Sequence, residues 1–261
     1  MARSKRTVYG SGSKLYNMQK TLNHQGFSEF GIRAIIFGMG DTLVDVTQIR
    51  RAACRRAART LALQKLIKNE KTFLAAYAKA DGSIEAPNLN HLFSDLRIIR
   101  RTLNLLDVSP SPAIIGTYLN AHRREVRRRL GLVRGLRPLF MFLRRQKLRI
   151  GVLSDGTTDE QLEQLETFRV LDLVDSLIVS EDLNVEKHDS AMFLQSIREL
   201  HVDAGNVVMV GDSPSRDIAG AKKNGIRTSL LDKTGTAKMP RGLKPDFIIS
   251  SLSEIKRLSS R

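Results

Sequence analysis

The stretch AIIFGMGDTLVD, residues 34–45, begins with four apolar residues and continues into a loop that contains Gly38, Gly40 and Asp41. Continuous apolar runs rich in Val, Ile and Leu are typical of strands that are buried on both faces of a sheet. Comparable runs follow at 150–154, 176–180, 207–212, 228–231 and 247–250. The stretch therefore predicts the first strand of a sheet, with a glycine-containing loop at its carboxyl end.

Segments of helical period separate the later runs, near 158–168, 189–201, 215–224 and 251–259. Strands that alternate with helices predict an α/β fold with a Rossmann-like parallel sheet and helices on both faces. Between Asp45 and Lys147 the period is helical and no comparable strand run occurs. We expect a basic N-terminal arm or transit peptide at 1–32, an α/β core at 33–45 and 148–261, and an inserted basic α-helical cap domain at 46–147.

The formal net charge of +16 is concentrated in one segment of the chain. Residues 46–147 contain 22 Lys or Arg against 6 Asp or Glu. Such a field attracts nucleic acid, an anionic membrane surface or an acidic protein, whereas the alternative is a solvated surface that favours solubility. The candidate RNA- or anion-binding residues lie at helical spacing and are Arg51, Arg55, Arg59, Arg123, Arg124, Arg127 and Arg128.

The first 28 residues contain five Lys or Arg and no acidic residue. This composition is typical of an organellar transit peptide, of a basic arm that lies along RNA, or of a disordered tail. The single cysteine, Cys54, excludes an internal disulfide and favours a reducing compartment. No apolar run approaches the roughly 20 residues that cross a bilayer. We therefore expect a soluble intracellular protein, in the mitochondrial or another organelle matrix or in the cytoplasm.

Four separated motifs follow one another along the chain. They are FGMGDTLVD at 37–45, IGVLSDG at 150–156, NVEKHDSAMF at 184–193 and VVMVGDSPSRDIAGAKKNG at 207–225. In this order they resemble the haloacid dehalogenase-like hydrolases, in the phosphatase-like branch with a helical cap, from about Arg33 to Leu258. In that family an Asp at the end of the first strand attacks phosphorus, and an Asp two residues later is the general acid and base.

The first motif departs from the family pattern at both acidic positions. Gly38 stands at the nucleophile position and Gly40 at the acid/base position, so no catalytic residue is expected. Gly40 followed by Asp41 resembles one branch of the family, but Gly38 does not. Glycine cannot form an aspartyl-phosphate, and it also removes a magnesium ligand. Neither Asp41 nor Asp45 is expected to replace it, because Asp41 lies beyond the strand end and should point elsewhere.

The resemblance implies vestigial roles for other matching positions. Thr42, Ser154 and Lys187 would bind phosphate, while Asp212 would bind Mg²⁺ with support from Asp217. Structural alternatives stay open for these residues. Ser154 can satisfy backbone groups at a strand end, Lys187 can pair with Asp212, and Asp217 can be a charge at the start of a helix. We expect no required cofactor and only weakened Mg²⁺ binding.

The missing nucleophile, the basic segment and the basic tail together favour a catalytically inactive family member. It would bind RNA or a ribonucleoprotein through the cap and the arm, as a structural component or assembly factor, for example of a mitochondrial ribosome. RNA and the other proteins of that assembly would be its partners, with contacts mainly to phosphate because only 5% of residues are aromatic. Two alternatives stay open: an active Mg²⁺-dependent phosphomonoesterase, and a sensor that binds a phosphorylated metabolite without hydrolysing it.

Overall fold

The computed structural model describes residues 30–82, 96–131, 135–185 and 189–259. These residues form a six-stranded sheet in the order β3-β2-β1-β4-β5-β6, and every neighbouring pair is parallel. The strands are β1 (Ala34–Gly38), β2 (Arg149–Ser154), β3 (Ser176–Val179), β4 (Val207–Gly211), β5 (Arg227–Leu231) and β6 (Phe247–Ile249). The predicted Rossmann-like α/β fold is confirmed. Most of the predicted N-terminal arm lies outside the described residues.

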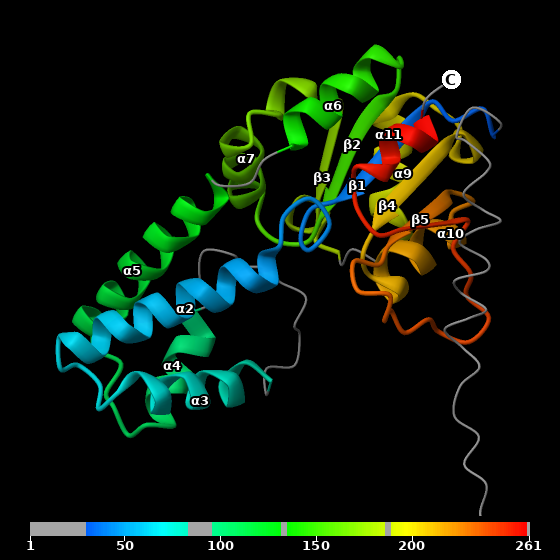
Figure 1. Ribbon diagram of the computed structural model, residues 1–261. Coiled ribbons are helices and arrows are strands. Elements are labelled where there is room, and N and C mark those ends of the chain that lie inside the picture. The colour runs from blue at the N-terminus through cyan, green and yellow to red at the C-terminus, as the bar shows by residue number, and fades with distance from the viewer. Residues whose placement is uncertain (1–29, 83–95, 132–134, 186–188, 260–261) are drawn as a thin grey trace, which may run out of the picture.

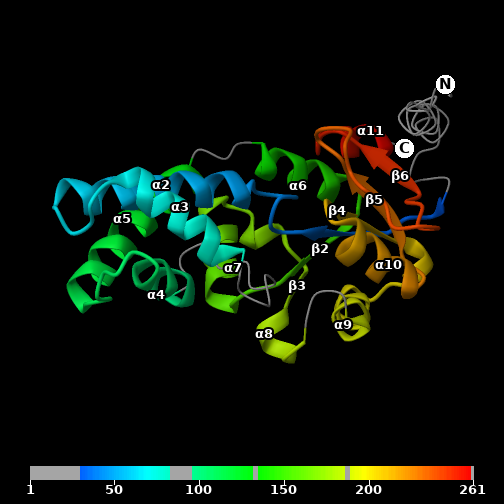
Figure 2. The same cartoon turned by 90° about the horizontal axis from the view of Figure 1, so that it is seen from below.

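Helices cover both faces of the sheet and also form a separate insert on one side of it (Figures 1 and 2). The insert contains α2 (Val46–Leu63), α3 (Glu70–Asp81), α4 (Leu96–Asn104) and α5 (Pro112–Leu130). The remaining helices are α6 (Leu136–Arg145), α7 (Thr158–Thr167), η2 (Leu171–Leu173), α8 (Ser180–Leu183), α9 (Ser190–Leu200), η3 (Ala204–Asn206), η4 (Pro214–Ile218), α10 (Ala219–Lys223) and α11 (Glu254–Ser259). None of these described helices is long and apolar enough to span a membrane.

Alternate residues of β1 enter two different apolar cores. Ile35 and Phe37 belong to the core shared with α6 and α11, whereas Ala34 and Ile36 belong to the core shared with α9 and α10. The period of two in a strand produces this separation, because successive side chains point to opposite faces. Both cores exclude water, which explains why the strand contains no polar residue.

The helical insert has an apolar core of its own. It is built from one face of each helix and includes Cys54, Ala57, Phe73, Leu103 and Tyr118. The insert is joined to the sheet at the beginning of α2 and the end of α5, because Val46, Ile49, Ala53, Val126 and Leu130 pack in the same core as Phe37.

Helix α6 lies within the range predicted as the inserted domain, but it packs on the sheet. The Phe140 ring stacks on the Phe37 ring of β1 with a centroid distance of 5.3 Å. Leu136, Leu139 and Leu143 also enter this core. The boundaries of the inserted domain stay a prediction, and the packing places α6 with the sheet.

Replacing Phe140 by Ala should lower the free energy of unfolding by about 3–5 kcal/mol, because a fully buried ring is removed beside Phe37. Chemical denaturation followed by circular dichroism measures this change. The matched control is Met141→Ala on the same helix, since Met141 is exposed. Equal losses in the two variants would contradict the packing of α6 on the sheet.

The thiol of Cys54 should be almost unreactive in the native protein. Burial raises the pKa of Cys54 to about 11, so the thiolate fraction at pH 8 is about 100-fold lower than for an ordinary cysteine. Iodoacetamide labelling followed by mass spectrometry reports on this residue alone, because the chain has one cysteine. Labelling should be slow in buffer and fast in denaturant; equally fast labelling in buffer would place the thiol at the surface.

Candidate functional site

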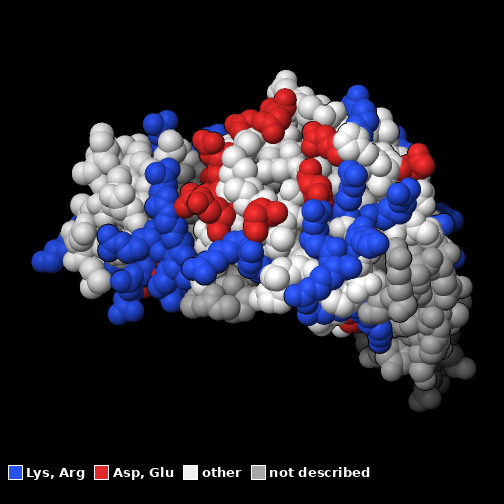
Figure 3. Space-filling view, turned by 90° about the horizontal axis from the view of Figure 1, so that it is seen from above, with Lys and Arg blue, Asp and Glu red and all other residues white. Residues whose placement is uncertain are grey.

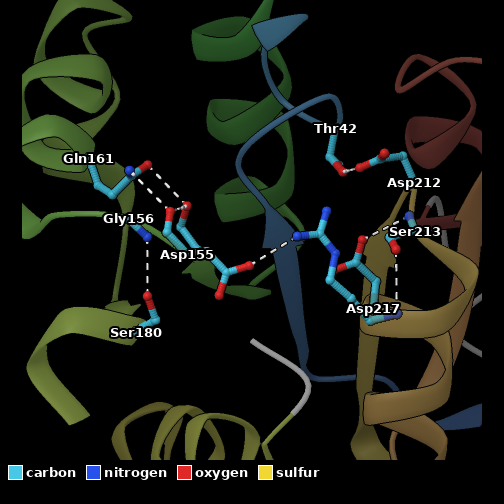
Figure 4. Close-up of polar contacts among 10 residues, drawn as sticks. Thr42, Asp155, Gly156, Gln161, Ser180, Asp212, Ser213 and Asp217 are labelled. Carbon is cyan, nitrogen blue, oxygen red and sulfur yellow. Dashed lines mark hydrogen bonds and ion pairs between the residues drawn. The ribbon is translucent and has the colours of Figure 1, made fainter. Parts of the chain in front are cut away.

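The carboxyl ends of β2, β1 and β4 lie side by side at one edge of the sheet. Gly38 pairs with Leu153, and Phe37 pairs with Val210, so the residues that follow these strands are brought together. Open α/β sheets bind ligands outside this edge. Figure 4 shows Thr42 and Asp212 pointing toward each other there, with Ser213 and Asp217 near them and Asp155 across from them. Lys187, the remaining predicted phosphate ligand, lies outside the described residues.

The loop after β1 turns tightly and directs its two carboxylates toward helix α2. The amides of Leu43 and Val44 both donate to the Met39 carbonyl, at 2.9 and 3.2 Å. Asp41 has a φ of 55°, and its carboxylate accepts hydrogen bonds from the amide of Thr47 at 2.9 Å and its hydroxyl at 2.7 Å. These contacts agree with the expectation that Asp41 does not take the place of a carboxylate at residue 38.

Asp45 is likewise used at the start of α2. Its carboxylate accepts a hydrogen bond from the Gln48 amide at 3.0 Å, which caps the helix. The loop therefore supplies one polar side chain to the strand edge. The Thr42 hydroxyl donates to Asp212 Oδ1 at 2.8 Å, which joins two predicted site residues across 170 positions of sequence.

Asp217 is fully buried beneath the end of β4. Its Oδ2 atom accepts a hydrogen bond from the Ser213 amide at 3.0 Å. A Cβ atom added at Gly211 would lie 2.3 Å from the Asp217 carboxyl carbon. Residue 211 must therefore be glycine for this carboxylate to occupy its place. The contacts support a structural role for Asp217 beside any role in binding a metal.

Ser154 is buried at the end of β2 and is bonded within its own loop. Its hydroxyl lies 3.1 Å from Gln161 Oε1 and 3.0 Å from the Asp155 carbonyl. The Gly156 amide donates to the Ser180 hydroxyl at 3.1 Å, which connects this loop to α8. In this conformation Ser154 therefore makes the structural contacts at the strand end that are the alternative to phosphate binding.

Two residues that sequence reasoning missed form an ion pair beside the predicted site. Arg216 Nη1 lies 3.3 Å from Asp155 Oδ2, and this contact is the dashed line that leaves the Asp155 carboxylate in Figure 4. The Asp155 side chain is only 2% exposed, so its charge requires a partner. The sequence offers one signal for this pair, because Asp155 follows the predicted site residue Ser154 and Arg216 precedes Asp217. No local pattern indicates that two residues 61 positions apart form an ion pair.

The residues at this edge fit a Mg²⁺ ion that is shared with a phosphate. Proteins bind Mg²⁺ through one or two carboxylates together with phosphate oxygens and water, and Asp212 and Asp217 are the two carboxylates here. In the part of the chain that the structure describes, no cluster of three or more His, Cys, Asp or Glu could bind a metal. The described residues by themselves therefore do not supply a complete set of metal ligands.

The seven predicted anion-binding arginines are all exposed on α2 and α5. On the face in Figure 3, Lys and Arg gather over the helical insert, with Asp and Glu beside them. Arg127 Nε donates to Glu163 Oε1 on α7 at 2.7 Å, and Arg128 donates to both carboxylate oxygens of Glu125. Hydrogen bonds from Arg128 and Arg129 lower the pKa of Glu125 to about 2. Part of the basic surface is therefore neutralised within the protein.

The chain matches the family model described as haloacid dehalogenase-like hydrolase over residues 35–231. It is 29% identical over 199 residues to the glyceraldehyde 3-phosphate phosphatase of Pyrococcus abyssi, covering 76% of this chain and 80% of that protein. It is 28% identical over 210 residues to the ribulose-1,5-bisphosphate 5-phosphatase of Halopiger xanaduensis, covering 76% and 84%. A solved HAD phosphatase from Thermococcus onnurineus is similar in fold, with a TM-score of 0.61, 21% identity and coverage of 87% and 97%.

These relatives correct the function predicted from the sequence. The prediction of a catalytically inactive component that binds RNA or a ribonucleoprotein is wrong, because relatives that match three quarters of the chain have the names of phosphatases. Clustered charge and a missing carboxylate at Gly38 do not outweigh the motifs that the chain retains. The organelle location and the partners stay predictions.

Replacing Gly211 by Ala should lower the free energy of unfolding by about 1–3 kcal/mol or more, because the new methyl group overlaps the buried Asp217 side chain. Urea denaturation measures the loss. Gly205→Ala is the matched control, since a Cβ atom there has no neighbour within 4 Å among the described residues. If Gly211→Ala were as stable as Gly205→Ala, Asp217 would not lie against β4.

Proposed function

This chain belongs to the haloacid dehalogenase-like hydrolases, and we propose that it is a Mg²⁺-dependent phosphomonoesterase for a small phosphorylated metabolite. The observation that carries the proposal is the hydrogen bond between Thr42 and Asp212, the two residues for which the sequence predicts a phosphate and a metal role. The relatives named as phosphatases of glyceraldehyde 3-phosphate and ribulose 1,5-bisphosphate support a small-molecule substrate.

The side chains at the strand edge divide the work of binding a phosphate. The Thr42 hydroxyl donates its one hydrogen to Asp212 in this conformation and would rotate to donate to a phosphoryl oxygen, while Arg216, paired with Asp155, places a positive charge close to the same edge. Asp212 and Asp217 are the residues that would bind Mg²⁺. When bound there, Mg²⁺ would offset the negative charge of the phosphoryl oxygens. Binding and charge compensation are most of what phosphoryl transfer requires of a protein.

Glycine at position 38 changes the first step of the family reaction. No aspartyl-phosphate can form there, so water attacks phosphorus directly in this proposal. The new bond joins the water oxygen to phosphorus while the bond from phosphorus to the ester oxygen breaks. The attacking water gives its proton to solvent, and the alcohol leaves after taking a proton from solvent. Turnover should be slow, because a missing nucleophile is costly in covalent mechanisms.

One observation favours a second function, which is binding of a phosphorylated metabolite without turnover. Gly38 removes the nucleophile, while Thr42, Asp212 and Asp217 keep an ordered arrangement around the same edge. A sensor needs these binding groups and not the nucleophile. Hydrolysis and binding must therefore be measured on the same preparation.

The unaltered chain should hydrolyse p-nitrophenyl phosphate slowly with Mg²⁺, and Asp212→Asn should abolish this rate. Gly38→Asp should raise kcat by roughly a thousandfold or more, because it restores a nucleophile at the strand end. Release of p-nitrophenol, measured by absorbance, gives both values.

Gly38→Asn is the matched control, since its side chain has nearly the same volume without a carboxylate. An unaltered chain with no rate above the buffer background would rule out the phosphomonoesterase. Phosphate binding by that inactive chain, measured by calorimetry, would instead support the sensor.

A further inference from the structure

Lys233 connects the loop after β1 to the segment that follows β5. Its Nζ atom donates to the Asp41 carbonyl at 2.7 Å, across 192 positions of sequence. Strand β4 lies between β1 and β5 in the sheet (Figure 1), so β1 and β5 are about 10 Å apart. The Lys233 side chain therefore bridges the carboxyl end of β4, which Asp212 follows.

The backbone at Lys233 is fixed by the residue before it. The Asp232 amide donates to the Ile249 carbonyl at 2.8 Å, which continues the pairing of β5 with β6. The Asp232 carboxylate accepts hydrogen bonds from the amides of Thr234 and Ala237, at 3.3 and 3.0 Å. Asp side chains that bond nearby amides in this way stabilise turns. Lys233 thus starts from a well-defined position, although its own side chain is exposed.

The hydrogen bond from Lys233 to Asp41 is charge-assisted, because the donor is an ammonium group. Among the residues that the structure describes, no carboxylate pairs with Lys233. No described anion therefore competes with the Asp41 carbonyl for this ammonium group.

Asp41 is held from two sides. Lys233 donates to its carbonyl from the sheet, and the Thr47 amide and hydroxyl donate to its carboxylate from α2. Its φ of 55° is uncommon for a residue other than glycine, so these contacts favour a conformation that the chain adopts rarely. The next residue, Thr42, has the hydroxyl that donates to Asp212. The position of Thr42 therefore depends on how Asp41 is held.

We propose that Lys233 is a positioning residue of the candidate site, which holds the loop after β1 so that Thr42 faces Asp212. The contact with Thr47 ties Asp41 to the helical insert, whereas Lys233 ties the same residue to the sheet that contains Asp212. Phosphate affinity at the strand edge then depends on a residue that does not contact phosphate. This consequence rests on the proposed function, but the hold on the loop does not.

Lys233→Met removes the ammonium group and keeps a side chain of similar length. Hydrogen–deuterium exchange of the ligand-free, full-length chain should then be about 2- to 10-fold faster at the amides of Leu43, Val44 and Thr47, because one exposed hydrogen bond is lost. Lys233→Arg should restore slow exchange, since a guanidinium group also donates to a carbonyl. The matched control is Lys238→Met, because Lys238 is exposed on the same segment and has no hydrogen bond or ion pair among the described residues.

Calorimetry with inorganic phosphate and Mg²⁺ on the same variants tests the consequence for the site. Lys233→Met should bind phosphate about 2- to 10-fold more weakly than the unaltered chain. Lys233→Arg and Lys238→Met should bind it as tightly as the unaltered chain does. Thermal unfolding verifies that all three variants fold, as expected for exposed side chains.

Failure of this proposal and failure of the strand-edge function give different results. Unchanged exchange of the loop in Lys233→Met, or equally faster exchange in Lys238→Met, overturns the proposal. Weaker phosphate binding with unchanged exchange also overturns it, since Lys233 would then contact phosphate directly. Faster exchange with unchanged phosphate affinity would make Lys233 a structural contact without a positioning role. If exchange is faster but the unaltered chain binds no phosphate, Lys233 does hold the loop and the proposed function fails.

Discussion

Strand β1 pairs with β2 on one side and with β4 on the other, so its register decides which residues of three strands end at the same edge. The same strand supplies side chains to both apolar cores, which leaves it no freedom to shift by one residue. This placement brings the residues of the candidate site together. Thr42 comes within 2.8 Å of Asp212, and helix α2 begins where the loop after β1 ends.

Most of the fold could be predicted from the sequence, because buried parallel strands leave an unbroken apolar signal. Each of the six predicted runs overlaps a strand, and in each case one end differs by one residue. It was harder to assign helix α6 to the core from the sequence, since Arg137, Arg144 and Arg145 give its segment the same positive charge as the insert. Its opposite face, with Phe140, packs on the sheet. A helix can be basic on one side and belong to a core on the other, and average charge along the sequence does not separate the two.

The site could be predicted only in part. Positions at strand ends follow from local pattern, and Thr42 and Asp212 do meet. The partner that each side chain selects depends on loops that are distant in sequence, as for Arg216 with Asp155 or Ser154 with Gln161. The clustered charge favoured a nucleic-acid partner too strongly. A count of arginines does not show that Arg127 and Arg128 are already bonded to Glu163 and Glu125.

The direct passage from β1 into α2 has a geometric consequence. Val46 and Ile49 anchor the first turn of α2 in the core of the sheet, and Asp41 is tied to Thr47. The loop after β1 and the first turn of α2 are therefore held together by the same contacts, so any displacement of this end of the helix would also shift the loop at the strand edge.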